Sequence, residues 1–130
     1  MSRELPPYAA FLGLRAEGDL LVMPFAPALI GAPGRLHGGA IAGMLEIAAL
    51  SVVLARLPEG ATAKPISVTV DYLREGRPQD SFARAHVLRL GRRVANVRAD
   101  LFQDDPDRLV ASARLNILVR QPVEPPAGTR

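Results

Sequence analysis

A histidine, two glycines and a glutamate stand close together in the first half of this 130-residue chain. His37 precedes Gly38 and Gly39, and Glu46 follows nine positions after the histidine. Glycines where a loop enters a helix permit close backbone approach, and the first N–H groups of a helix carry a partial positive charge. Such groups can stabilise an oxyanion that develops on a carbonyl under attack. A carboxylate about two helical turns away, in apolar surroundings, suits a general base for water or a nucleophile.

Each of these residues also has a purely structural interpretation. Glu46 could be exposed at a gap in the helix packing, or it could pair with an arginine, and its position alone does not separate these alternatives from catalysis. His37 could cap the helix or bond a backbone carbonyl, and we favour that orienting role over a proton shuttle. A metal site is not expected. The one other histidine, His86, lies on a predicted strand, and no compact spacing of His, Asp and Glu accompanies either histidine.

The helix that must position Glu46 is the longest predicted element. Residues 39–57 contain strong helix formers and no proline, and Pro58 and Gly60 follow as a stop signal. Apolar residues occur on nearly every side of this helix. We therefore expect it to be buried on nearly every side, as the core around which the rest of the chain wraps.

Strands are predicted before and after this helix. Two short strands flank a Glu17-Gly18 turn, and an irregular loop rich in proline and glycine leads into the helix. After the helix the side chains alternate with a period of two, and short turns make the last strands antiparallel neighbours. The predicted strands are residues 12–16, 19–23, 66–72, 81–90, 94–102 and 109–120, the loop is 25–36, and the later turns are 75–78, 91–93 and 104–107.

This order of elements predicts an α+β fold with one long central helix wrapped by an antiparallel sheet of about five or six strands. We expect a single domain over residues 1–121 and a flexible C-terminal tail over residues 122–130. One sheet covers only one side of such an apolar helix. A homodimer with closed symmetry is therefore predicted as well. A homotetramer made of two such dimers is the expected larger assembly, and the sequence leaves the choice between dimer and tetramer open.

Composition narrows the choice of partners and compartment. The chain has no cysteine, which excludes disulfides and thiolate sites and fits a reducing cytoplasm. The net charge is +3, but the few aromatic residues do not interleave with basic runs, so nucleic acid is not an expected partner. The N-terminus lacks an apolar signal core, and the longest apolar run, residues 40–55, contains Glu46 and is short for a membrane span. We expect a cytoplasmic protein.

Three segments together carry a family resemblance. They are His37-Gly38-Gly39 with its acid at Glu46, then Val70-Asp71-Tyr72-Leu73-Arg74, and then Arg89-Leu90-Gly91-Arg92-Arg93. In this order they resemble the hotdog-fold thioesterases of the phenylacetate-degradation (PaaI-like) and aryl-CoA type, over residues 12–119. The resemblance implies a hotdog fold, an acyl-CoA substrate, and hydrolysis of its thioester without a metal or another cofactor.

The resemblance also implies roles for the residues of the first segment. In the family the acid on the central helix is the nucleophile or general base, which corresponds to Glu46. The backbone N–H after the histidine polarises the thioester carbonyl, which corresponds to Gly38 in the turn made with His37 and Gly39. The family usually has Asn or Gln six positions before the histidine, whereas this chain has Gly31 there.

Substrate-binding residues are implied on two strands. The family's site lies at a dimer interface, where a hydroxyl from the next strand of the partner assists the water. Ser67 or Thr69 is the candidate for it, unless Pro65 occupies that position. Arg92 and Arg93 lie in the turn where the family binds the phosphates of CoA, and the planar guanidinium fork matches phosphate oxygens. Solubilising surface charge is the alternative for both arginines. Weaker candidates for the phosphate contact are Arg74 and Arg114.

The favoured hypothesis is an acyl-CoA thioesterase acting on a small-molecule substrate. A hotdog protein that binds acyl-CoA without hydrolysing it is the first alternative, and a hotdog dehydratase acting on hydroxyacyl thioesters is the second. The spacing of His37 and Glu46 fits the thioesterase pattern better than the dehydratase pattern.

Overall fold

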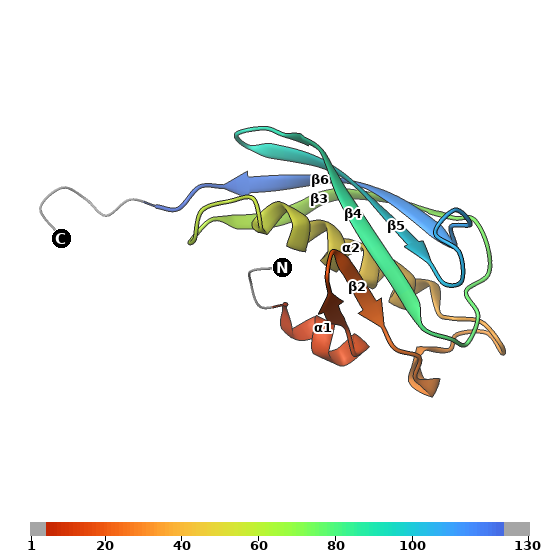
Figure 1. Cartoon of the computed structure of the whole chain (residues 1–130). Coiled ribbons are helices and arrows are strands. Elements are labelled where there is room, and N and C mark those ends of the chain that lie inside the picture. Colours follow the sequence, from red (N-terminus) through yellow and green to blue (C-terminus); the bar gives the residue numbers. More distant parts are fainter. Residues whose placement is uncertain (1–4, 124–130) are drawn as a thin grey trace, which may run out of the picture.

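The computed structural model describes residues 5–123, in which one long helix packs against a single twisted sheet (Figure 1). The helix is α2 (Gly38–Leu54). The sheet has six strands in the order β1-β2-β4-β5-β6-β3, and every neighbouring pair is antiparallel. The strands are β1 (Arg15–Glu17), β2 (Leu20–Met23), β3 (Thr62–Tyr72), β4 (Ser81–Leu90), β5 (Val94–Phe102) and β6 (Ala111–Arg120). The predicted α+β arrangement is confirmed.

Helix α2 buries one side against the sheet. It starts one residue before the predicted start and ends three residues before the predicted end, where the chain turns toward Pro58. The side chains that it buries completely are Met44, Leu45, Ala49 and Val53. Glu46 and Leu50, on another flank, are only half-buried. The expected burial on nearly every side is therefore wrong for this flank, because a single sheet covers only one side of a helix.

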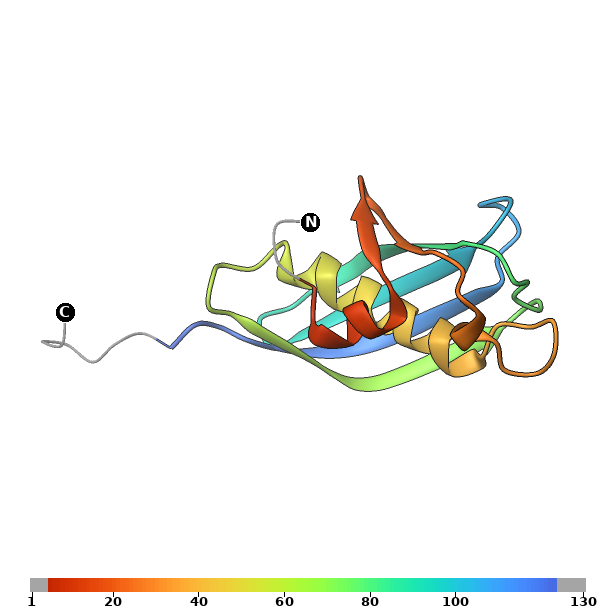
Figure 2. The same ribbon diagram turned by 90° about the horizontal axis from the view of Figure 1, so that it is seen from below.

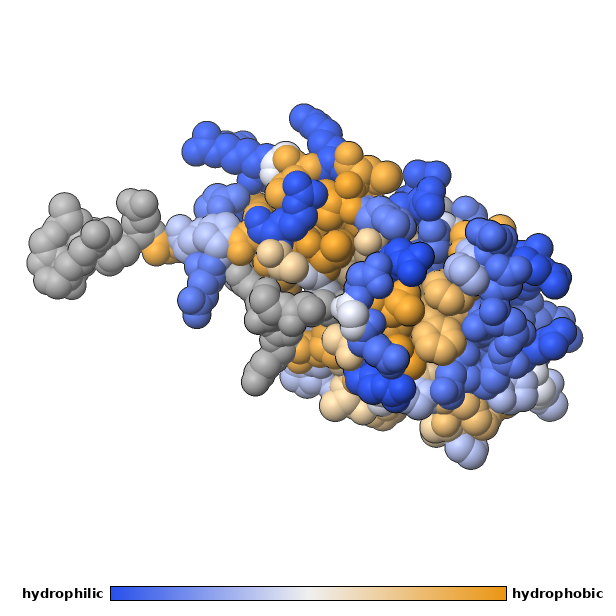
Figure 3. Space-filling view, viewed as in Figure 1, coloured by the Kyte–Doolittle hydropathy of each residue, from blue (hydrophilic) through white to orange (hydrophobic). Residues whose placement is uncertain are grey.

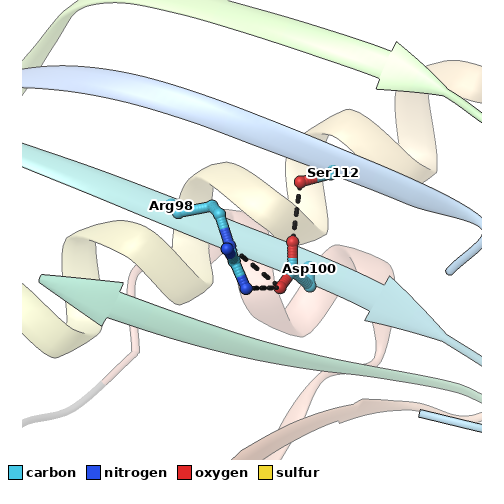
Figure 4. A network of polar contacts seen from close by, with 3 residues as sticks. All are labelled: Arg98, Asp100 and Ser112. Carbon is cyan, nitrogen blue, oxygen red and sulfur yellow. Dashed lines mark hydrogen bonds and ion pairs between the residues drawn. The ribbon is translucent and has the colours of Figure 1, made fainter. Parts of the chain in front are cut away.

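Strands β5 and β6 form the centre of the sheet and pair along their length. Alternate side chains on both strands are buried, and many are alanines, which allow the helix to approach the sheet closely. On the other face, Asp100 joins the two strands (Figure 4). Its Oδ2 accepts a hydrogen bond from Arg98 Nη2 over 2.9 Å, and its Oδ1 accepts one from the Ser112 hydroxyl over 2.6 Å.

The N-terminal segment differs from the prediction. In place of a strand over residues 12–16, the chain first forms helix α1 (Pro7–Leu12), and β1 follows. Pro7 in the first turn and Gly13 as a left-handed C-cap, with φ of 74°, both favour a short helix. Ala9 and Leu12, three positions apart, are buried. Helix α1 lies across α2 on the side turned away from the sheet (Figure 2).

The other boundaries shift by a few residues or not at all. Strands β4 and β5 have the predicted bounds, and β6 starts two residues later than predicted. Strand β3 starts at Thr62 and not at residue 66, because Pro65 is tolerated in a strand that pairs only with β6 and has a bulge between Pro65 and Ser67. The predicted loop over residues 25–36 contains the short 3-10 helix η1 (Pro27–Leu29).

Strand β3 forms an open edge of the sheet, 11 residues long. Several apolar side chains on it are exposed, among them Ile66 at 56% and Val68 at 41%. A long apolar edge of this kind offers unpaired backbone groups to another strand.

The predicted tail falls largely on residues 124–130, which lie outside the described residues. None of the helices within residues 5–123 is long and apolar enough to cross a membrane. In the same part of the chain, no group of three or more His, Cys, Asp or Glu side chains is arranged to hold a metal ion.

Candidate active site

The turn that starts helix α2 is held by the side chain of His37. Its Nδ1 accepts a hydrogen bond from the Gly39 N–H over 2.8 Å, so His37 is the N-cap of the helix. The backbone N–H of His37 donates to the Leu29 carbonyl, also over 2.8 Å. Because Nδ1 is the acceptor, the neutral ring carries its proton on Nε2. This geometry agrees with the capping interpretation of His37.

Gly38 presents an unused N–H at the start of the helix. Nothing among the described residues accepts a hydrogen bond from it, whereas the N–H of Gly39 is occupied by His37. The Gly38 carbonyl accepts a hydrogen bond from the Tyr72 hydroxyl over 3.1 Å, and a Cβ added at Gly38 would lie 3.5 Å from the Tyr72 ring. The free N–H, at the positive end of the helix dipole, is suited to receive an oxyanion.

Glu46 lies two turns further along α2 on its half-buried flank. Within residues 5–123 its carboxylate makes no hydrogen bond and no ion pair, so the alternative of a paired arginine does not apply to this part of the chain. Gly43 stands one turn before Glu46, and a Cβ there would lie 3.0 Å from the Tyr8 ring. Glu46 is therefore an unpaired acid at the border of the region covered by α1.

Gly31 lies directly against His37. A Cβ added at Gly31 would be 3.0 Å from the His37 Cα and 3.1 Å from its Cδ2. The loop around Gly31 is tight, since the Gly31 N–H donates to the Arg35 carbonyl over 3.0 Å. An Asn or Gln side chain, expected here from the resemblance, would therefore have to displace His37 or the loop.

Ser67 and Thr69 lie on the face of β3 that points away from α2. They pair with Asn116 and Arg114 of β6, and the Ser67 hydroxyl accepts a hydrogen bond from Asn116 Nδ2 over 2.8 Å. The alternate residues, such as Val70, pair with buried positions of β6 that face the helix. The described chain therefore does not bring Ser67 or Thr69 together with Gly38 and Glu46.

The hydroxyl that does reach the start of the helix belongs to Tyr72, to which the sequence analysis assigns no role at the site. Pro65 pairs with the buried Ile117 and so belongs to the helix side of β3, but it carries no hydroxyl. The contact between Tyr72 and Gly38 joins residues far apart in the sequence, so no local pattern indicates it.

Arg92 and Arg93 lie at the far end of the molecule from Gly38. Together with Arg120 they line a hollow of about 420 Å³ beside the end of β6. This end adjoins the C-terminus of α2, and a 17-residue helix is about 25 Å long. One chain therefore does not place these arginines at the candidate site. Arg120, which the sequence interpretation missed, comes beside them through the pairing of β5 with β6.

Two hollows flank the start of α2. One, of about 350 Å³, adjoins Gly38 and Tyr72, and it has charged side chains at Arg35, Arg74 and Glu75. Arg35 and Glu75 form an ion pair of 3.1 Å, and Arg74 Nη1 donates to a backbone carbonyl, that of Leu109, over 2.9 Å. We call this the charged hollow.

The second hollow, of about 200 Å³, lies on the α1 side of the same turn. Its walls are mainly apolar, and we call it the apolar hollow. Among the residues that line it are Tyr8, Phe11, Leu12, Leu29, His37 and Gly39.

A larger hollow, of about 410 Å³, lies between the C-terminal half of α2 and β4, where Ala48, Val52 and Ala85 form its walls. Figure 3 shows hydrophobic side chains gathered over this region. It shares no lining residue with the two hollows at the helix start. We therefore centre the candidate site on the first turn of α2.

Comparison with known families gives one match, to the acyl-CoA thioesterase N-terminal domain, over residues 27–117. No curated protein matches the chain. Among solved structures, a putative thioesterase related to phenylacetic acid degradation from Ralstonia eutropha JMP134 is 28% identical. The match covers 89% of this chain and 92% of that one, with a TM-score of 0.79. A thioesterase from Haemophilus influenzae is 25% identical over 90% of this chain and 85% of its own, with a TM-score of 0.81.

A Bacillus halodurans protein determined with CoA shares the fold at 22% identity. That match covers 87% of this chain and 75% of the other, and the TM-score is 0.79. These similarities confirm the predicted hotdog fold. Because the family match spans more than half of its residues, the chain belongs to the acyl-CoA thioesterase N-terminal domain family.

Proposed function

We propose that the protein is an acyl-CoA thioesterase that hydrolyses the thioester to a free acid and CoA. The observation that carries this proposal is the presence, on one helix, of a free hydrogen-bond donor and an unpaired acid. Gly38 has a free N–H at the helix start, and Glu46 is an unpaired, half-buried carboxylate two turns later. The family match and the thioesterases of similar structure support the same reaction class.

The proposed reaction needs only these groups and water. The carbonyl oxygen accepts a hydrogen bond from the Gly38 N–H while a C–O bond forms to a water molecule, and Glu46 takes a proton from that water. The C–S bond of the tetrahedral intermediate then breaks, and the proton passes from Glu46 to the leaving thiolate. In the alternative route Glu46 itself attacks the carbonyl, the C–S bond breaks and CoA leaves as the thiolate. Water then hydrolyses the resulting anhydride, which gives the free acid, restores the Glu46 carboxylate and supplies the proton that the thiolate takes up. No metal or cofactor takes part.

Isosteric replacement of the acid tests this chemistry. We expect Glu46→Gln to lower kcat by about 100- to 10,000-fold, the usual contribution of a positioned base. CoA release from acetyl-, hexanoyl-, dodecanoyl- and benzoyl-CoA would be followed with a thiol reagent. Glu59→Gln, which changes an exposed acid after the helix, is the matched control and should keep full activity. Equal CoA release by the Glu46 variant and the unchanged protein would remove Glu46 from the mechanism.

The same assay separates the alternatives. No CoA release from any substrate, together with thermal stabilisation by CoA, would favour a protein that binds acyl-CoA without hydrolysing it. Water released from a hydroxyacyl thioester would favour a dehydratase.

We also propose a homodimer formed by antiparallel pairing of the open β3 edges. The exposed apolar residues of this edge, including Ile66 and Val68, support such pairing. In an antiparallel pair the start of one β3 lies beside the end of the other. The hollow formed by Arg92, Arg93 and Arg120, which adjoins the start of β3, would then come from the second copy toward Gly38 of this chain.

At that place the arginines would hold the phosphates of CoA, the ligand of the Bacillus halodurans protein. Antiparallel pairing keeps both helices on one side of the joined sheet, so Ser67 and Thr69 of either copy face away from the site. The predicted assembly of two dimers is not required by this site.

Mixing two inactive variants tests the shared site. One carries Glu46→Gln, and the other carries Arg92→Ala with Arg93→Ala. If Glu46 of one chain works with the arginines of the other, each mixed dimer has one intact site, and activity returns after exchange of subunits. No recovery in dimers shown to be mixed would place acid and arginines in the same chain and refute the shared site.

A further inference from the structure

Two aromatic side chains on α1 are exposed beside the candidate site. Phe11 is 80% exposed and Tyr8 is 49% exposed. Their rings stack on each other with centroids 5.7 Å apart and planes 12° apart. Apolar groups exposed together in this way often mark a surface that another molecule covers.

The stacked pair forms one wall of the apolar hollow, and His37 and Gly39 form another. The Tyr8 ring also lies against Gly43, one turn before Glu46, at a point where an added Cβ would be only 3.0 Å away. The Tyr8 ring thus extends from the apolar hollow at the helix start to the flank of α2 that carries Glu46. Helix α1 supplies the roof of this region (Figure 2).

The two hollows beside the helix start differ in charge. The charged hollow has Arg35, Arg74 and Glu75 among its lining residues. No Arg, Lys, Asp or Glu side chain lines the apolar hollow, and the Nδ1 of its histidine accepts a hydrogen bond from the Gly39 N–H. Desolvation therefore favours a hydrocarbon group in the apolar hollow and the polar part of a thioester on the other side.

Size sets a further limit. The apolar hollow measures about 200 Å³. A protein cavity of about 150 Å³ holds one benzene molecule. An open hollow of this size covers a six-carbon chain or a single ring, whereas a chain of twelve carbons would extend beyond it.

We propose that the acyl group of the substrate occupies the apolar hollow, and that Tyr8 and Phe11 on α1 set the upper limit of its size. This inference rests on the proposed thioesterase function. In it, Tyr8 and Phe11 determine specificity and take no part in bond making. Truncation of Phe11 would open the wall and admit longer chains, whereas a larger ring would close it further.

Binding of non-hydrolysable analogues tests the inference separately from hydrolysis. We would measure Kd by calorimetry for CoA thioethers with two-, six- and twelve-carbon chains, using the unchanged protein, Phe11→Ala and Phe11→Trp. We expect the unchanged protein to prefer the six-carbon over the twelve-carbon analogue by about tenfold or more, and Phe11→Ala to reduce this preference about tenfold. Phe11→Trp should raise the Kd of the six-carbon analogue more than that of the two-carbon analogue.

Leu88→Ala is the matched control, because Leu88 is an exposed apolar residue on β4 that lines none of these hollows. It should leave all preferences unchanged. Three results would each overturn the inference. The ratio of the Kd values for the twelve- and six-carbon analogues could be the same in both Phe11 variants as in the unchanged protein. The unchanged protein could bind the twelve-carbon analogue tightly, or it could bind no analogue at all. Size-dependent binding that responds to Phe11, without CoA release from true thioesters, would refute the proposed hydrolysis and leave the inference standing.

Discussion

Replacement of His37 distinguishes a structural from a chemical role for this side chain. In His37→Ala the Gly39 N–H loses an acceptor 2.8 Å away. Loss of an N-cap costs about 1 kcal/mol, which lowers the Tm of a domain of this size by about 4 °C. The first turn of α2 also loosens, so the Gly38 N–H loses its direction. Misplacement of a catalytic group by about 1 Å can lower a rate about 100-fold.

His37→Asn is the matched variant, because asparagine is among the best N-caps but does not transfer protons as histidine does. We expect this variant to unfold at nearly the same temperature as the unchanged protein and to keep most of its kcat, whereas His37→Ala loses on both measures. Thermal denaturation and the thiol-release assay give the two numbers. A His37→Asn protein that is fully stable but as slow as His37→Ala would refute the capping account and assign the ring to proton transfer.

Two further predictions concern buried contacts. Gln103 donates from its side-chain amide to the Ser81 hydroxyl over 3.2 Å in a buried setting, so Gln103→Leu should lower the free energy of unfolding in urea by about 1–3 kcal/mol. Gln121→Leu, at an exposed position, should leave the free energy of unfolding unchanged. Equal urea midpoints for the two variants would contradict the role of Gln103. Gly31→Asn should destabilise the protein by about 1–3 kcal/mol through overpacking against His37, without faster hydrolysis. A gain in both stability and rate would show that the loop makes room for the amide.

The central elements could be predicted from the sequence because their signals are local. Strands β4 and β5 have the predicted bounds, since alternating side chains and turn residues mark both ends. Helix α1 was not predicted because it has only six residues, two of them buried, and two prolines just before it and at its start suggest a break. Here the cap at Gly13 was the signal that could have found the helix.

For the site, the residues of the helix start could be predicted, but their neighbours could not. Two features of the site depend on which strands become neighbours: the hydrogen bond from Tyr72 to Gly38 and the position of Arg120. Short stretches of sequence do not predict that strand order. The orientation of Ser67, by contrast, follows from the alternation of side chains along its strand. The apolar residues that alternate with it, such as Val68, had to face the helix, so Ser67 had to face away.

The bulge at Pro65 limits the registers in which another strand can pair with the open edge of β3. An uninterrupted apolar edge accepts strands in many registers and can grow into fibres. Pro65 offers no N–H, and the bulge beside it shifts the side chains of β3 by one residue relative to a regular ladder. A regular strand therefore meets a mismatch wherever it crosses this point, so only a few registers allow pairing along the rest of the edge. The bulge therefore disfavours the addition of one strand after another into a fibre. It still allows two copies of the chain to pair in one register and form a closed dimer.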